Sequence, residues 1–139
     1  MKKAQSVMIY GILTVVLGVI VLSSTFMLSK SISESNSKEM AILISDTILA
    51  KAENKILESK ALGEFSDNEI RFIIDLPKRI GNREYSIVGG GDKLSVRILG
   101  TDTIIRKRKI GSNITTYGIS FPPSMEIIYD PFTNSVTIK

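Results

Sequence analysis

An uncharged apolar run near the N-terminus constrains this chain more than any other feature. Residues 7–28 read VMIYGILTVVLGVIVLSSTFML, which is 22 residues without a charged side chain. As an α-helix the run is about 33 Å long, enough to cross a hydrocarbon core of about 30 Å. Lys2 and Lys3 precede the run, and this basic flank favours a cytoplasmic N-terminus with the rest of the chain outside.

Two other interpretations of this run remain open. A secretory signal peptide has a shorter apolar region, of roughly 7–15 residues, which ends at a cleavage site of small residues. Here the polar residues 23–25 are followed by three more apolar residues, so a retained helix is favoured. A helix buried inside a soluble protein is the third interpretation, but residues 29–139 offer little material to cover it on all sides.

An amphipathic helix is predicted to follow the apolar run. From residue 29 to about residue 62, apolar side chains recur in steps of three and four, which places them on one helix face. The members of this face are Ile32, Met40, Leu43, Ile44, Thr47, Ile48, Ala52, Ile56 and Leu57. Gly63 is predicted to follow the helix as its C-cap. The Ser-rich residues 29–38 are the weakest part of this pattern, so the prediction is either one long helix or two helices in series with a bend or a frayed turn there.

The pattern changes to strict alternation beyond Phe65, which is typical of β-strands. Short alternating segments are separated by turns rich in Gly, Asn, Asp and Pro, and we expect about seven strands in residues 63–139. The predicted fold class is therefore α+β. A long helix, hydrophobic in residues 5–28 and amphipathic in residues 29–62, precedes a small antiparallel β-sandwich or barrel-like domain.

The composition argues against catalysis. The chain has no cysteine and no histidine, so it lacks thiol zinc ligands and the commonest general base. The sequence GGGD at residues 89–92 has neither the spacing nor the strand-before-helix context of a phosphate-binding loop. Asp92, Asp102 and Asp130 are predicted turn residues and form no EF-hand pattern. We expect no enzymatic activity, no catalytic residue, no cofactor and no metal.

A basic run is the most prominent polar feature of a chain whose net charge is only +4. In a strand, Arg106 and Arg108 would lie on one face, and Lys107 and Lys109 on the other. This favours an edge or protruding strand that its charges protect from further pairing. A contact for polyanions, such as anionic surface glycans, DNA or an acidic neighbouring subunit, is the other interpretation. No aromatic residue interrupts the run, so no specific nucleic acid is expected.

Three more residues are candidate sites. Asn113 begins the sequence Asn-Ile-Thr, an N-glycosylation sequon within a predicted turn. Gly11 and Gly18 are seven residues apart in the apolar run and lie on the same helix face, where small residues permit close helix packing.

The chain begins MKKAQS, a short polar stretch directly before the apolar helix, and this start resembles the class III leader of archaeal type IV pilins and archaellins. In this stretch Lys2 and Lys3 are followed by a small residue and a glutamine. In that group a prepilin peptidase cuts between the small residue and the glutamine. The resemblance implies cleavage between Ala4 and Gln5, with the helix kept on the mature protein. Residues 76–87 are also similar to a pattern of small archaeal membrane-anchored pilin-like proteins, "LP…IGG…Y.I".

The resemblance implies a structural function at the cell surface. The helix would first lie in the plasma membrane with a cytoplasmic N-terminus, and then form the core of a pilus-like filament used for adhesion or surface contact. The implied partners are copies of itself or other pilins, the prepilin peptidase, and an assembly ATPase with its platform. The alternative is a bitopic membrane-anchored protein, a minor pilin or an archaellum accessory, whose extracellular β-domain binds envelope or partner components.

Overall fold

A computed structural model describes most of the chain. For residues 2–8 it describes the backbone only. Backbone and side chains are described for residues 9–101, 103–111 and 113–139. The chain divides into two compact units, Met1–Ser37 and Lys38–Lys139.

A single helix, α1 (Lys2–Gly63), begins in the first unit and ends in the second. No proline precedes Pro77, so nothing removes a hydrogen bond from the helical ladder. The Ser-rich residues 29–38 are helical as well, so the structure has the first of the two predicted alternatives, one long helix. Gly63 is the last helical residue, but it does not adopt the positive φ of a C-cap glycine. A Cβ at Gly63 would instead collide with the ring of Tyr129, so close packing requires this glycine.

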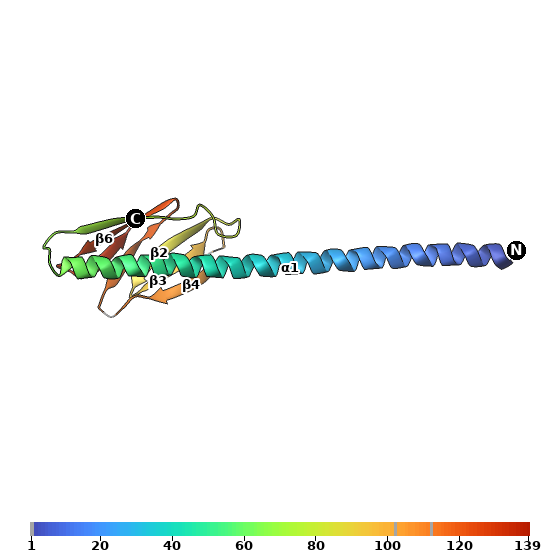
Figure 1. Cartoon of the computed structure of the whole chain (residues 1–139), viewed down its shortest axis with the longest axis horizontal. Helices are drawn as coiled ribbons and strands as arrows, with labels where there is room; N and C mark the ends of the chain where they lie inside the picture. Colours follow the sequence, from blue (N-terminus) through green and yellow to red (C-terminus); the bar gives the residue numbers. More distant parts are fainter. Residues whose placement is uncertain (1, 102, 112) are drawn as a thin grey trace. The chain divides into compact units, whose positions relative to one another are not determined.

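Seven strands follow the helix and form one sheet in the second unit (Figure 1). The strands are β1 (Ile70–Asp75), β2 (Tyr85–Gly91), β3 (Lys93–Ile98), β4 (Ile104–Lys109), β5 (Thr115–Ser120), β6 (Ser124–Asp130) and β7 (Ser135–Ile138). Their order is β1-β6-β7-β5-β2-β3-β4. Neighbours pair antiparallel except β5 and β7, which are parallel. Strands β2 to β5 follow the Greek-key order, since β5 returns to lie beside β2.

The α+β class and the order of helix before strands are confirmed, but the predicted sandwich or barrel-like closure is wrong. The strands form a single open sheet, with β1 and β4 as its edges, and the sheet is mixed because of the β5–β7 pair. Alternation indicates which side chains share a face, but it does not indicate which strands pair. The C-terminal part of α1 covers one face of this sheet, so no second sheet is needed to close the core.

The core of the second unit lies between the C-terminal part of α1 and the sheet. Ile48, Leu49, Ala52 and Ile56 of the helix belong to one buried cluster with the inward side chains of the strands. The helix also buries small residues at intervals of seven. These are Ser45, Ala52 and Ser59, and all three are fully buried. Small side chains in one row allow the helix to approach the sheet closely.

The predicted apolar face of α1 is only partly correct. Ile48, Ala52 and Ile56 are buried as expected, whereas Leu43 and Leu57 are exposed. Ile32, Met40 and Thr47 are exposed as well. The helix face that contacts the sheet therefore differs from the predicted apolar face, because it includes Ser45, Ser59 and Leu49 in place of Leu43 and Leu57. The serines were overlooked because they are polar, but each hydroxyl donates to a carbonyl one turn earlier, those of Ala41 and Lys55, at 2.7 Å.

Candidate functional site

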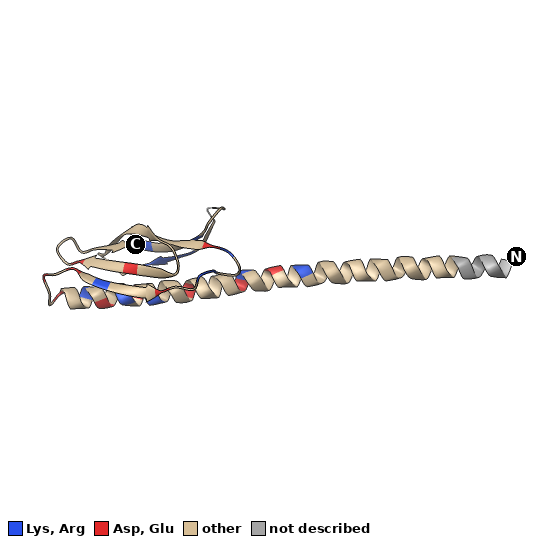
Figure 2. Cartoon of the chain, turned by 90° about the horizontal axis from the view of Figure 1, so that it is seen from above, with Lys and Arg blue, Asp and Glu red and all other residues tan. Residues whose placement is uncertain are grey.

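Residues 9–28 of the first unit present apolar surface on all sides of the helix. Fourteen large hydrophobic side chains between Ile9 and Leu28 are 49–73% exposed. Figure 2 shows no charged residue along this part of α1. The helix is long and apolar enough to cross a membrane. Because each Å² of apolar surface kept in water costs about 25 cal/mol, such a surface needs lipid or other apolar side chains around it.

The polar side chains inside this apolar segment are satisfied by the helix itself. The hydroxyl groups of Thr14, Ser24 and Thr25 each donate to the carbonyl four residues earlier, at 2.8 Å. A hydroxyl without a partner is costly in apolar surroundings, because no water is present to accept its hydrogen bond. These bonds therefore make the segment compatible with lipid despite its polar residues.

Gly11 and Gly18 lie on the open surface of the same segment. No described atom lies within 4 Å of a Cβ built at either glycine. Both positions could therefore accept a close neighbour, and their role in helix packing stays a prediction. The proposed leader-processing residues lie outside the residues whose side chains the structure describes. These are Lys2, Lys3, Ala4 and Gln5.

The basic run lies on β4, which is an edge strand as predicted. Arg106 and Arg108 pair in register with Val96 and Leu94, whose side chains are in the core, so these arginines lie on the face that α1 covers. Lys107 and Lys109 lie on the opposite, outer face of the sheet, opposite Ser95 and Lys93. The four basic side chains therefore do not form one surface.

Both arginines of β4 form ion pairs with α1. Arg106 Nε donates to both carboxylate oxygens of Asp46, at 2.9 and 3.1 Å, and Arg108 Nε donates to Glu53. The hydrogen bond and the charge of Asp46 raise the pKa of the Arg106 guanidinium. These pairs tie the edge strand to the helix, since Asp46 and Glu53 are two helical turns apart on one face.

The two lysines of β4 differ in their surroundings. Lys109 Nζ lies 3.3 Å from Asp92 Oδ2. Within the described part of the chain, Lys107 has no acidic partner within ion-pair distance. A polyanion contact that involves all four residues stays a prediction, although the acidic neighbours of Arg106, Arg108 and Lys109 reduce what these three can offer to a ligand.

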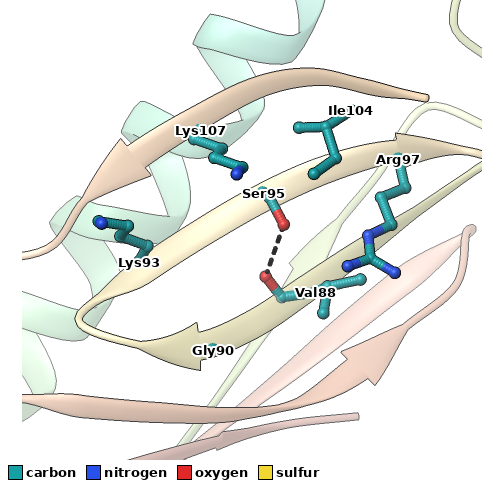
Figure 3. A pocket seen from close by; sticks show the side chains of 7 residues that line it. All are labelled: Val88, Gly90, Lys93, Ser95, Arg97, Ile104 and Lys107. Carbon is teal, nitrogen blue, oxygen red and sulfur yellow. Dashed lines mark hydrogen bonds between the residues drawn. The ribbon is translucent and has the colours of Figure 1, made fainter. Parts of the chain in front are cut away.

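A shallow pocket lies on the outer face of the sheet, over β2, β3 and β4. Its volume is about 190 Å³, and it is lined by Val88, Gly90, Lys93, Ser95, Arg97, Ile104 and Lys107. In Figure 3, Lys107 and Arg97 lie on opposite sides of Ser95, and the Lys93 side chain extends away from Arg97. The Ser95 hydroxyl donates to the Val88 carbonyl at 3.3 Å. The Arg97 Nε atom is buried and has no hydrogen-bond partner among the described residues.

A β-bulge shapes one wall of this pocket. The register of β3 and β4 shifts between Val96 and Arg97, so that Val96 pairs with Arg106 but Arg97 pairs with Ile104. The extra residue, Ile105, packs against the core, and Ile104 lines the pocket. Bulges reorient side chains in this way because two residues of one strand oppose one residue of its neighbour.

The sequence interpretation missed the pocket, although part of its signal was visible. Lys93, Ser95 and Arg97 are spaced at steps of two, as polar residues on the solvent face of a strand should be. Their proximity to Lys107 depends on the register of β3 and β4, which alternation does not specify.

Asn113, the candidate glycosylation site, is exposed in the turn before β5. It has φ of 77°, a left-handed conformation that asparagine tolerates. Its backbone carbonyl accepts a hydrogen bond from the side-chain amide of Asn134. The position is accessible, and its modification stays a prediction.

Comparisons with family models, with curated proteins and with solved structures gave no significant match for this chain.

Proposed function

We propose that this protein is a structural subunit of a type IV pilus-like surface filament, which polymerises through its N-terminal hydrophobic helix and serves in adhesion or surface contact. The observation that carries the proposal is the exposed apolar surface of residues 9–28. Before assembly the helix lies in the plasma membrane with its N-terminus in the cytoplasm. Transfer from lipid into a bundle of identical helices keeps this surface out of water throughout assembly.

The second unit supports this division of roles, because its core is complete without the apolar segment. Every described residue of the buried cluster, including those partly buried against it, lies between Ala41 and Ile138. The apolar segment is therefore not the core helix of a soluble domain. Its surface is available for lipid or for other subunits, while the sheet unit is free to form the exterior of a filament.

The proposal implies processing and assembly partners. A prepilin peptidase would remove the leader between Ala4 and Gln5, and an assembly ATPase with its platform would drive extraction from the membrane. Other copies of this chain, or other pilins, would be the filament neighbours. Gly11 and Gly18 would permit close packing between helices, since a glycine lets two helix backbones approach.

Mass spectrometry of the mature N-terminus tests the processing step. We expect a chain that begins at Gln5 when the protein is produced with its native membrane and secretion machinery. A double Lys2→Gln, Lys3→Gln variant should remain unprocessed. An intact Met1 in the native protein would contradict the proposal.

Electron microscopy of the cell surface tests polymerisation. We expect helical filaments that contain this chain, and their loss in the Gly11→Leu or Gly18→Leu variant. Val16→Leu is the matched control, because it changes an exposed apolar side chain of the same segment without filling a glycine position. Filaments that persist in both glycine variants would rule out the packing role of the glycines.

A second candidate function is a bitopic protein that never polymerises, such as a minor pilin or an archaellum accessory. The observation that favours it is the basic pocket on the outer face of the sheet, which suits a unit that binds envelope components or a partner. Membrane-bound protein without filaments would select this candidate.

A further inference from the structure

We propose that the outer face of the sheet binds an acidic saccharide, whose anionic group enters the pocket between Lys93, Arg97 and Lys107. The anionic group is a carboxylate or a phosphate, which these side chains recognise by the same charge-assisted hydrogen bonds. This inference does not depend on polymerisation, because all the residues concerned lie in the second unit.

The charges around the pocket favour the binding of an anion. Three of its seven lining residues are cationic, and none is acidic. The nearest carboxylate in sequence, Asp92, is paired with Lys109. Like charges around one pocket repel one another where no counter-charge lies among them, and a bound anion relieves that repulsion.

The Arg97 guanidinium provides an unused donor. Its Nε atom is buried, and no described residue accepts its hydrogen bond. A buried donor without an acceptor is destabilising, so such a group needs an explanation in a native structure. A ligand in the pocket would meet the terminal nitrogens of Arg97, because an Nε atom that is closed to water is also closed to a ligand. Arg97 is held beside this space by the bulge that pairs it with Ile104.

A place for the sugar ring lies next to the pocket. Gly90 pairs in register with Tyr117 of β5, and Val88 pairs with Ile119. The side chains of Tyr117 and Ile119 are 53% and 51% exposed, and the register places them on the same face as the pocket. Because Gly90 has no side chain and a Cβ there meets no atom within 4 Å, the space between the tyrosine and the cations is open.

The pocket is too small to enclose a whole oligosaccharide. Its volume of about 190 Å³ lies below the roughly 300–1,000 Å³ of sites that enclose small molecules. It can hold one anionic group while the adjoining ring rests on Tyr117. Such a site recognises one sugar unit of a polysaccharide on a surface. Several copies of the protein that bind the same polysaccharide would strengthen attachment by multivalency.

Calorimetric titration of the full chain tests the proposal, in micelles of a polyoxyethylene detergent that carries neither sugar nor charge. The probes are hexagalacturonate, neutral maltohexaose, inorganic phosphate and a thymidine oligonucleotide. We expect hexagalacturonate to bind and maltohexaose not to bind. We expect phosphate to compete at higher concentration, because it fills the pocket without contacting Tyr117.

Variants distinguish binding in the pocket from binding to positive charge spread over the surface. We expect Lys93→Gln, Lys107→Gln and Arg97→Gln each to raise the Kd for hexagalacturonate about tenfold, equivalent to about 1.4 kcal/mol. Lys78→Gln removes the same charge from an exposed position outside the pocket and should leave the Kd unchanged. Gly90→Val keeps every charge but fills open space, and it should weaken binding as much as the loss of a lysine.

Tyr117→Ser separates the two parts of the site. It should raise the Kd for hexagalacturonate but leave the Kd for phosphate, measured by direct titration, unchanged. The pocket would be ruled out as the binding site if Gly90→Val bound hexagalacturonate as tightly as the native protein. It would also be ruled out if Lys78→Gln and Lys93→Gln lost the same amount of affinity for hexagalacturonate. Tighter binding of the oligonucleotide than of hexagalacturonate would overturn the saccharide as the ligand.

Discussion

Tyr85 is the largest of the fully buried side chains, and its hydroxyl is held by one hydrogen bond. The hydroxyl donates to the Pro77 carbonyl at 2.7 Å. Burial raises the pKa of Tyr85 to about 12, because the phenolate would have to form away from water. The neutral form is therefore part of the folded state.

Alkaline pH should destabilise the protein through Tyr85. The stabilising effect of its raised pKa is complete below the unfolded-state pKa of about 10 and is lost as the pH rises through about 12. We expect the free energy of unfolding, from urea titration followed by circular dichroism, to fall by roughly 2–3 kcal/mol over this range from Tyr85. Tyr85→Phe should make the fall smaller, whereas Tyr117→Phe, at an exposed position, should leave it unchanged.

Gly118 permits the close contact of β5 with β7. Its φ is +105°, and a Cβ there would collide with the carbonyl oxygen of Ile138, its partner in the parallel pair. Gly118→Ala should therefore lower the free energy of unfolding by about 2 kcal/mol or more, measured by urea titration. Gly90→Ala is the control, because its Cβ enters open space, and a change of about 0.5 kcal/mol or less is expected. Equal losses in the two variants would contradict the steric explanation.

At the scale of elements, the contact between α1 and the sheet depends on the row of small residues. Ala52 is fully buried in the middle of this row, between Ser45 and Ser59. We expect Ala52→Leu to cost about 1–3 kcal/mol of unfolding free energy, because the added atoms force the helix away from the sheet. Ala61→Leu makes the same change at an exposed position of the same helix and should be close to neutral. Thermal and urea unfolding would both reveal the difference.

Periodicity predicted the elements whose pattern is local. The apolar run, the amphipathic helix and the number of strands follow from spacings within single segments, and the edge position of β4 follows from the charges on both its faces. The parallel pairing of β5 with β7 involves strands that are not neighbours in sequence, so no local pattern specifies it. The buried role of Ser45 was missed for a different reason, since its polarity is hidden by a hydrogen bond to its own helix.

The candidate site was predictable only in part. The charges of β4 are evident in the sequence, but their pairing with Asp46 and Glu53 requires the helix to lie against that strand. The pocket requires in addition the register shift that brings Ile104 beside Arg97. Both depend on packing between segments that are far apart in the chain.

At the scale of the whole molecule, each unit carries one property that the other lacks. The first unit presents continuous apolar surface, and the second presents a closed core with a charged outer face. Under the functions proposed above, attachment belongs to the first unit and recognition to the second. Changes in one unit should leave the function of the other intact.

A charge in the apolar segment should release the protein from the membrane. Asp at the centre of a membrane helix costs about 2.5–3.5 kcal/mol, so we expect Leu17→Asp to lower the fraction that stays in the membrane after carbonate extraction. Leu43→Asp is the control, because Leu43 is similarly exposed but belongs to the second unit. Full retention of the Leu17→Asp variant would show that the apolar segment does not anchor the chain.

The bulge at Ile105 adds an apolar side chain to the core while Ile104 stays on the outer face of the sheet. Deletion of Ile105 would restore plain alternation along β4 and would leave Ile104 opposite Arg97 on the outer face. Arg106 and Arg108 would keep their places beside the helix. Edge strands tolerate such small losses better than central strands, because only one neighbour must be satisfied. Deletion of Ile105 should nevertheless lower the free energy of unfolding, because Ile105 packs against the core, while the pocket keeps its lining residues.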